Sequence, residues 1–143
     1  MVSESSNDLI AVRPVGWARP AGLSYGMVGA NRRHLSIAGQ LGGATGTSAP
    51  SSRASFAQEF VRSLENVVAV VESAGGRPAD IAALRVYVTS IDDFKAAQPE
   101  IAEAWRTLLG RHFPAITMVE VSALFERRAR VEIEGTALLR MEG

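Results

Sequence analysis

The sequence contains no cysteine and few of the other side chains that serve as nucleophiles or metal ligands. Without cysteine it has no disulfide, no thiol nucleophile and no thiolate metal site. Its two histidines, His34 and His112, lie far apart in the sequence, so we do not expect a zinc or iron site built from protein ligands. Lys95 is the only lysine and lies in a polar stretch, which argues against a Schiff-base lysine in an apolar pocket.

An excess of charge and a long hydrophobic run are also missing. Fifteen basic and fifteen acidic residues give a formal net charge of zero at pH 7, which provides no basic field for nucleic acid. No basic region followed by an apolar run marks a signal peptide, and no apolar run approaches the roughly 18 residues of a membrane span. We therefore expect a cytoplasmic protein that binds neither nucleic acid nor membrane.

Size and composition predict one globular domain. The chain has 143 residues, of which 47% are hydrophobic and 21% are charged, as in ordinary globular proteins. Residues 1–8 are polar and rich in serine, so we predict a polar leader there and a single domain over residues 9–143.

Two helices are predicted from their caps and apolar stripes. Ser55 is a natural N-cap, and Gln58 three residues later completes the pattern of a capping box. The second helix is predicted to begin at Asp92 or Gln98, with Pro99 in its first turn, where a proline is tolerated.

Six segments have the pattern of strands, and they surround the two helices in the order β-β-β-α-β-α-β-β. They cover residues 9–15, 24–29, 34–40, 82–89, 115–121 and 129–137, with a hairpin turn predicted at 29–33. We predict an α+β fold with a mixed six-stranded sheet and both helices on one face. Two helices cannot cover both faces of such a sheet, so the open face is predicted to meet another subunit.

The last strand carries two carboxylates on one face. Val131 and Ile133 alternate with Glu132 and Glu134, so the two glutamates point the same way, roughly 7 Å apart. One interpretation is that they are solvated or paired with arginines such as Arg130. The other is that one of them lies in a pocket, where it orients water or moves protons.

Several short motifs follow one another in a familiar order between about Trp17 and Leu139. They are Tyr25, Ala38-Gly39-Gln40, the helix segment from Asn66 to Gly75, Val86-Tyr87-Val88, Asp93-Phe94, Pro114-Ala115-Ile116-Thr117 and Val131-Glu132-Ile133-Glu134. On these motifs the chain resembles the RidA family, also called the YjgF/YER057c/UK114 family. The resemblance implies a homotrimer of chorismate-mutase-like subunits with a small-molecule pocket at each subunit interface. It also implies hydrolysis of reactive enamines or imines such as 2-aminoacrylate to ammonia and a 2-oxo acid, without a cofactor.

The resemblance also implies roles for single residues. Glu132 would position the attacking water, and the substrate would be bound by Tyr25, Gly39, Gln98, Ile116 and Thr117. Gln98 replaces an asparagine that is frequent in the family.

Ile116 is the departure with the largest consequence. It stands where the family motif PAR[ST] has an arginine that holds the substrate carboxylate. A carboxylate facing isoleucine would lose a charge-assisted hydrogen bond of roughly 1.5–3 kcal/mol. Arg85 or Arg53 could replace that arginine, although surface ion pairing is the more common role for both.

Three functions are compatible with this sequence. The first is a divergent enzyme of the RidA type that acts on an enamine or imine by hydrolytic deamination or proton transfer, and not the archetypal 2-aminoacrylate deaminase. The second is a specialised catalyst of a biosynthetic pathway, such as a cyclase. The third is a non-catalytic protein that binds or regulates through the same pocket, because fold alone does not determine function.

Overall fold

The computed structural model describes residues 8–142, so the predicted leader lies outside the described residues except for Asp8. The elements are β1 (Ile10–Val12), β2 (Gly26–Val28), β3 (Arg32–Gln40), α1 (Phe56–Ser73), the short 3-10 helix η2 (Pro78–Asp80), β4 (Ile81–Val88), α2 (Ile91–Leu109), β5 (Ala115–Glu120) and β6 (Val131–Arg140). The predicted order of strands and helices is confirmed.

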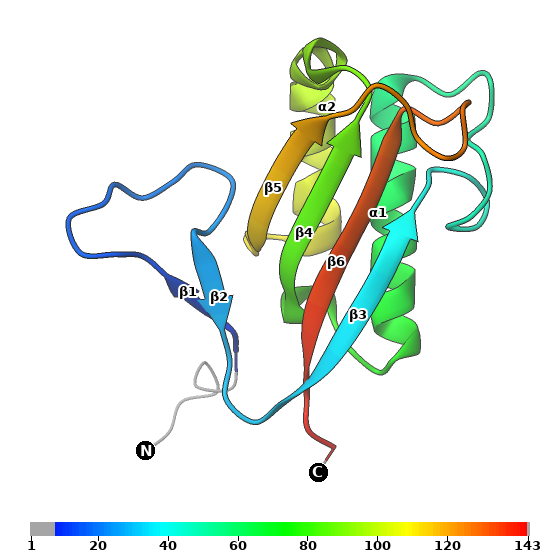
Figure 1. The fold of residues 1–143 in the computed structure, drawn as a ribbon. Helices are drawn as coiled ribbons and strands as arrows, with labels where there is room; N and C mark the ends of the chain where they lie inside the picture. Colours follow the sequence, from blue (N-terminus) through cyan, green and yellow to red (C-terminus); the bar gives the residue numbers. More distant parts are fainter. Residues whose placement is uncertain (1–7, 143) are drawn as a thin grey trace.

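The six strands form two sheets, and the prediction of one six-stranded sheet is corrected in that respect. The main sheet is four-stranded with the order β3-β6-β4-β5, in which only β4 and β5 are parallel. Strands β1 and β2 pair with each other and form an arm beside the β5 edge (Figure 1). Each is only three residues long, because the prolines and glycines between residues 14 and 22 interrupt the extended chain.

The arm contacts the start of β5 through Ser24. Ser24 forms an isolated parallel bridge with Ala115, and its hydroxyl donates to the Phe113 carbonyl at 2.6 Å. The segment at 29–33 does not connect paired strands, since β2 pairs with β1 and β3 pairs with β6. The predicted hairpin there is therefore wrong, and the segment carries the chain from the arm to the sheet.

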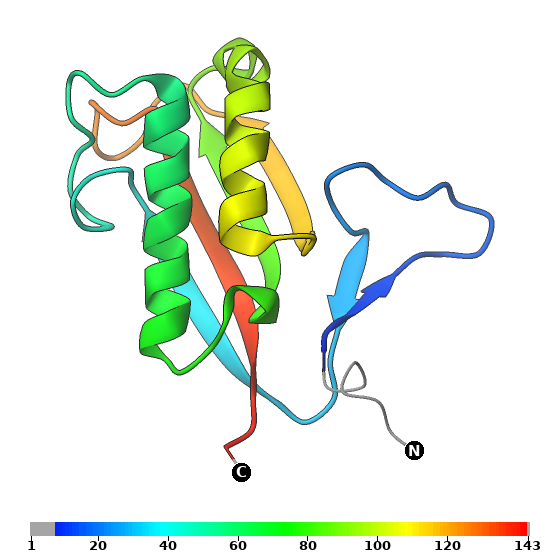
Figure 2. The ribbon, with the colours of Figure 1, turned by 180° about the vertical axis from the view of Figure 1, so that it is seen from behind.

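Both helices cover one face of the main sheet, as predicted (Figure 2). Strand β6 shows why, because Val131, Ile133 and Ala137 are fully buried on the helix side, while the residues between them are only partly buried. Leu84 and Val86 of β4 meet the same core. The alternation leaves the other face of the sheet open, with both polar and apolar side chains on it.

The first helix begins where its cap predicts. The Ser55 hydroxyl accepts from the Gln58 backbone N–H, and the Ser55 N–H donates to the Gln58 side chain. The second helix begins earlier than predicted, with Ser90 as its N-cap, so Pro99 lies inside it. The proline is tolerated because its missing N–H falls on the exposed side of the helix, where water can bond the freed carbonyl of Lys95.

A buried carboxylate ties α1 to the start of β6. Glu59 is completely buried and accepts from the backbone N–H groups of Arg130 and Val131, and from Arg130 Nε at 2.8 Å. All these donors lie on the neighbouring strand end, so Glu59 fixes the position of the strand that carries Glu132.

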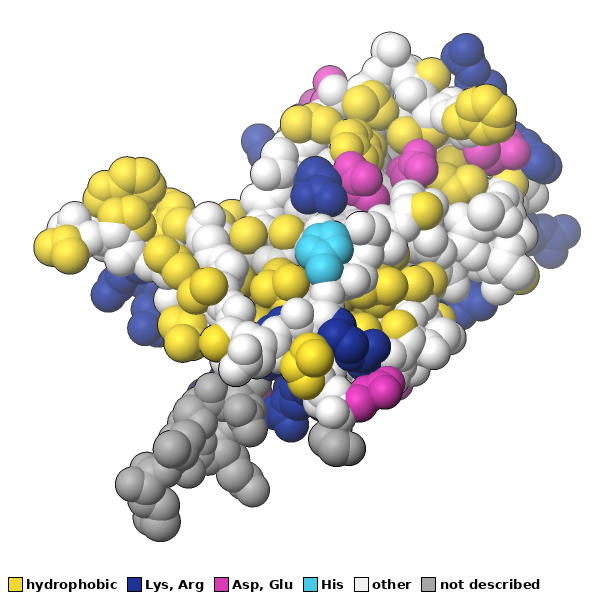
Figure 3. Space-filling model, turned by 60° about the horizontal axis from the view of Figure 1, so that its bottom comes forward, with side chains coloured by type: hydrophobic (Ala, Val, Ile, Leu, Met, Phe, Trp, Pro, Cys, Tyr) yellow, Lys and Arg dark blue, Asp and Glu magenta, His cyan; other side chains and the backbone are white. Residues whose placement is uncertain are grey.

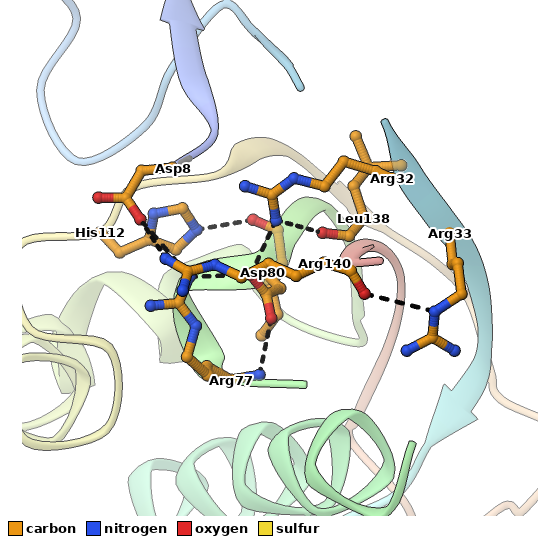
Figure 4. A network of polar contacts seen from close by, with 9 residues as sticks. Asp8, Arg32, Arg33, Arg77, Asp80, His112, Leu138 and Arg140 are labelled. Carbon is orange, nitrogen blue, oxygen red and sulfur yellow. Dashed lines mark hydrogen bonds and ion pairs between the residues drawn. The ribbon is translucent and has the colours of Figure 1, made fainter. Parts of the chain in front are cut away.

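A second polar network closes the opposite end of the sheet (Figure 4). Buried Asp80 binds the guanidinium groups of Arg32 and Arg77, each at 3.1 Å. Asp8 accepts from Arg140 at 3.1 Å, which lowers the pKa of the Asp8 carboxyl below its usual value. The contact joins the beginning of the arm to the end of β6.

Candidate functional site on the open face of the sheet

Glu132 lies on the open face of the main sheet, on its second strand. Its neighbours Val131 and Ile133 are buried on the helix side, so Glu132 and Glu134 share the opposite face, as the sequence predicts. Across the sheet, Glu132 is aligned with Tyr87 of β4.

Gly39 lies directly against the Glu132 carboxylate. A Cβ atom built on Gly39 would collide with the Oε1 atom of Glu132. The pairing of β3 with β6 changes register between Ile37 and Gln40, so the backbone at Gly39 lies within an irregular part of the strand. Because Gly39 has no side chain, the Glu132 carboxylate can lie against its backbone, and the structure therefore brings together two residues that the sequence placed in the site.

Glu134 has different partners from Glu132. Its Oε1 atom accepts from the Tyr87 hydroxyl at 2.5 Å and from Arg85 Nε at 3.0 Å. The Tyr87 hydrogen bond, and then Arg85, lower the pKa of the Glu134 carboxyl, and the same hydrogen bond raises the pKa of Tyr87. Glu134 is thus paired with an arginine, but with Arg85 instead of Arg130, which binds Glu59.

Thr117 and Tyr25 lie in two other places. Thr117 is exposed on β5, aligned with Arg85. Tyr25 is on the arm, where its hydroxyl donates to the Ala18 carbonyl at 3.1 Å and its ring packs edge-on against Trp17.

Ile116 and Gln98 lie on the helix side of the sheet. Ile116 is aligned with Leu84 and packs against the hydrophobic core. Gln98 is exposed on α2. Within one copy of the chain, the sheet therefore separates these two residues from Glu132 and Gly39.

Sequence reasoning missed the contact of Arg85 and Tyr87 with Glu134. The signal was present, because both residues occupy the polar positions of their strand, but the pairing of β4 with β6 was needed to bring them together. Arg53, the other arginine considered, is exposed in the loop before α1. Two shallow hollows lie around α1 and α2, away from the Glu132 face.

Two further searches covered the part of the chain that the structure describes. Over residues 8–142, no cluster of histidine, aspartate or glutamate has the arrangement of a metal site. Neither helix in that range is long and apolar enough to cross a membrane.

The arm exposes an unusual share of hydrophobic side chains (Figure 3). Among the large hydrophobic residues that are more than a third exposed, six belong to the arm: Ile10, Val12, Val15, Trp17, Tyr25 and Val28. An exposed apolar surface of this kind marks an interaction site more often than a free surface.

The fold is that of a small α+β protein with two helices on one face of its main sheet, and known proteins share this architecture. The family model described as "Endoribonuclease L-PSP" matches residues 18–139, which is most of the chain. The chain belongs to this family, and its predicted relation to the RidA/YjgF proteins is confirmed.

Two solved structures show the likeness over the whole fold. A Rid-family protein of unknown function, YyfB from Yersinia pestis, has a TM-score of 0.74 and 28% identity, covering 92% of this chain and 99% of that one. The YjgF gene product of Escherichia coli has a TM-score of 0.63 and 31% identity, covering 94% of this chain and 95% of that one. The α+β fold predicted from the sequence is confirmed.

Curated relatives match over a shorter stretch. A 2-iminobutanoate/2-iminopropanoate deaminase of Salmonella typhimurium is 39% identical over 79 residues, 55% of this chain and 60% of its own length. A RutC family protein of Haemophilus influenzae is 38% identical over 77 residues, 54% of this chain and 58% of its own length. The chain thus spans about three fifths of the length of these relatives.

Proposed function

We propose that this protein is a cofactor-independent enamine/imine deaminase in which Glu132 positions and deprotonates water. The observation that carries the proposal is the contrast between the two glutamates. Glu134 is held by Tyr87 and Arg85, whereas Glu132 lies against Gly39 with its carboxylate on the open face. The relatives named as iminobutanoate deaminases support the same reaction class.

The reaction needs one base that also returns a proton. Glu132 takes a proton from water as the water oxygen attacks the C=N carbon, and the imine nitrogen becomes an amine. The imine reacts in its protonated form, so attack of the water oxygen leaves a neutral amine and a hydroxyl group on the same carbon. Glu132 then returns its proton to the amine nitrogen, the C–N bond breaks and ammonia leaves. The hydroxyl proton passes to Glu132 as the carbonyl forms, and Glu132 releases it to solvent, which had supplied the proton of the imine. The net change is imine plus water to carbonyl compound plus ammonia, which requires no oxidant.

The complete site is proposed to lie between two subunits of a homotrimer. Gly39 and Glu132 are on the open face of one copy, while Gln98 and Ile116 are on the other side of the sheet. If all four contact one substrate, two copies of the chain must contribute to each pocket. The exposed hydrophobic arm supports this assembly.

Ile116 is proposed to weaken the activity toward 2-aminoacrylate, the archetypal substrate of the family. Its side chain offers no hydrogen-bond donor, so 2-aminoacrylate should be a poor substrate. A ribonuclease activity is not proposed, because a formal net charge of zero provides no overall basic field to attract RNA.

The proposal is tested by generating 2-iminobutanoate with an amino-acid oxidase and following its loss in the presence of semicarbazide, which traps the imine. We expect the protein to reduce the semicarbazone yield and to accelerate ammonia release. Rates equal to those of the uncatalysed reaction, across imines with and without a carboxylate, would contradict it.

A further inference from the structure

A substrate of the imino-acid type needs a cation near Glu132, and one guanidinium is placed to provide it. Four basic side chains on strands β3, β4 and β6 share the Glu132 face by register: Arg32, His34, Arg85 and Arg140. Arg32 is aligned with Arg140, and its nearly buried guanidinium is paired with Asp80. Arg140 is at the far end of β6 and binds Asp8, and His34 is aligned with Leu138, also near that end. Arg85 alone lies next to the strand positions of Glu132 and Tyr87.

We infer that Arg85 is the residue that binds the carboxylate of an anionic imine, and that Glu134 and Tyr87 position its guanidinium. The inference rests on the proposed function for the identity of the reacting group. It assigns the substrate class, an imine that carries a carboxylate, and gives Glu134 a positioning role.

The hydrogen bonding of Arg85 leaves both Nη groups of its guanidinium available for a substrate carboxylate. The Nε–H of Arg85 donates a hydrogen bond to Glu134 at 3.0 Å. Within residues 8–142, the two Nη groups of Arg85 make no hydrogen bond. Those groups form a planar fork that matches the two oxygens of a carboxylate. Glu134 itself is fixed by the Tyr87 hydroxyl at 2.5 Å, so the fork has a defined direction.

The strand register places this fork beside Glu132. Arg85 is aligned with Glu134 and Tyr87 is aligned with Glu132, so Arg85 and Glu132 are diagonal neighbours on one face. Diagonal neighbours in a sheet are roughly 7–8 Å apart, a distance that both long side chains can bridge with a small acid between them. Thr117, aligned with Arg85 on the other side, exposes a hydroxyl to the same space.

The charge of Glu134 should make Arg85 a weak binding site for a second carboxylate. A guanidinium that is already paired with one carboxylate attracts a second one less strongly. Arg85 would therefore select acids over neutral analogues without binding them tightly, which is consistent with the poor turnover of 2-aminoacrylate proposed above.

Binding of the product-like acid 2-oxobutanoate tests the inference without any turnover. Calorimetry or NMR titration would compare the full-length protein with Arg85→Met, Arg85→Lys and the control Arg53→Met. We expect Arg85→Met to weaken 2-oxobutanoate binding about tenfold or more, Arg85→Lys to recover part of it, and Arg53→Met to have no effect. Binding of the neutral 2-oxobutanamide should change by less than about twofold.

Parallel kinetics with oxidase-generated 2-iminobutanoate separate this inference from the proposed function. If the protein turns over the imine and Arg85→Met has the same KM, the inference is wrong and the proposed function stands. If no imine is turned over but Arg85→Met no longer binds 2-oxobutanoate, the inference stands and the proposed function fails. The role of Arg85 would be overturned if Arg85→Met weakened binding of 2-oxobutanoate and 2-oxobutanamide equally. It would also be overturned if Arg53→Met, and not Arg85→Met, weakened binding of 2-oxobutanoate.

Discussion

At the scale of single residues, two identical side chains on one strand have different surroundings. Glu134 accepts two hydrogen bonds from Tyr87 and Arg85, whereas Glu132 lies against a glycine on an open face. The period of a strand predicts that both point the same way, but it cannot say which one has a cationic partner. That difference comes from β4, which is nearly fifty residues away in the chain.

We expect Glu132→Gln to lower turnover of 2-iminobutanoate by about a hundredfold or more, because the amide cannot accept a proton from water. Folding and assembly should be unchanged, as judged by circular dichroism and light scattering. Glu134→Gln, the matched control on the same face, should leave kcat within about tenfold and act mainly on KM through Arg85. Equal losses of kcat in the two variants would contradict this assignment.

Because Ile116 has no hydrogen-bond donor, we expect slow turnover of 2-aminoacrylate. A dehydratase that uses pyridoxal phosphate can supply 2-aminoacrylate, and we expect turnover well below that of a relative with arginine at this position. Ile116→Arg should lower KM by about tenfold if its guanidinium reaches the substrate, since a charge-assisted hydrogen bond is regained. Ile116→Leu is the control, and an unchanged KM in Ile116→Arg would show that position 116 does not face the substrate carboxylate that Arg85 is inferred to bind.

The Tyr87–Glu134 hydrogen bond gives a pH dependence with a defined sign. The pKa of Glu134 is lowered, so its stabilising contribution is present above the unfolded value of about 4.3 and is lost as pH falls through the lower folded value. The pKa of Tyr87 is raised, so its contribution is present below about 10 and is lost as pH rises through the folded value.

Urea unfolding of the wild type and Glu134→Gln at fixed protein concentration tests this dependence. The difference in free energy of unfolding should be constant between about pH 5 and 9 and should decrease outside that range. A difference that grows as the pH falls below 4 would contradict the sign.

At the scale of elements, local signals predicted more than pairing signals did. The Ser55–Gln58 cap is encoded within four residues, and the start of α1 follows it. The start of α2 was misjudged because Pro99 resembles a first-turn proline, while the cap used is Ser90. The separate arm depends on which strands pair, and the Gly39–Glu132 contact depends on an irregular register in β3. The local sequence pattern predicts neither the pairing nor the register.

Glu59 shows how one element fixes another. It falls in the apolar stripe of α1, three residues after Phe56 and one before Phe60, which is the sequence signal of a buried carboxylate. We expect Glu59→Ala to lower the free energy of unfolding by about 3–5 kcal/mol, because it leaves the buried donors of Arg130 and Val131 without a partner. Urea unfolding measures this change.

The control for that experiment is Glu72→Ala, an exposed glutamate near the end of the same helix, which should change stability by less than about 0.5 kcal/mol. A similar small change for Glu59→Ala would mean that the strand end is held by other contacts.

At the scale of the whole molecule, the open sheet face and the exposed arm both call for a partner. One copy of the chain has Glu132 and Gln98 on opposite sides of the main sheet, and its arm exposes six large hydrophobic side chains. Native mass spectrometry and light scattering should therefore give a homotrimer of the 15.2 kDa chain. A stable monomer at micromolar concentration would contradict both the assembly and the shared pocket.

Mixed assemblies test whether two copies build each pocket. Glu132→Gln and Gln98→Ala should each reduce imine hydrolysis when present alone. If Glu132 of one copy acts beside Gln98 of the next, subunits of the two variants that are unfolded together and refolded will form some pockets with both native residues. Activity of the mixture should then exceed the average of the two separate preparations, while a mixture refolded separately and combined afterwards should not. No gain in mixed trimers, confirmed by mass spectrometry to contain both variants, would mean that each pocket is built from a single copy of the chain.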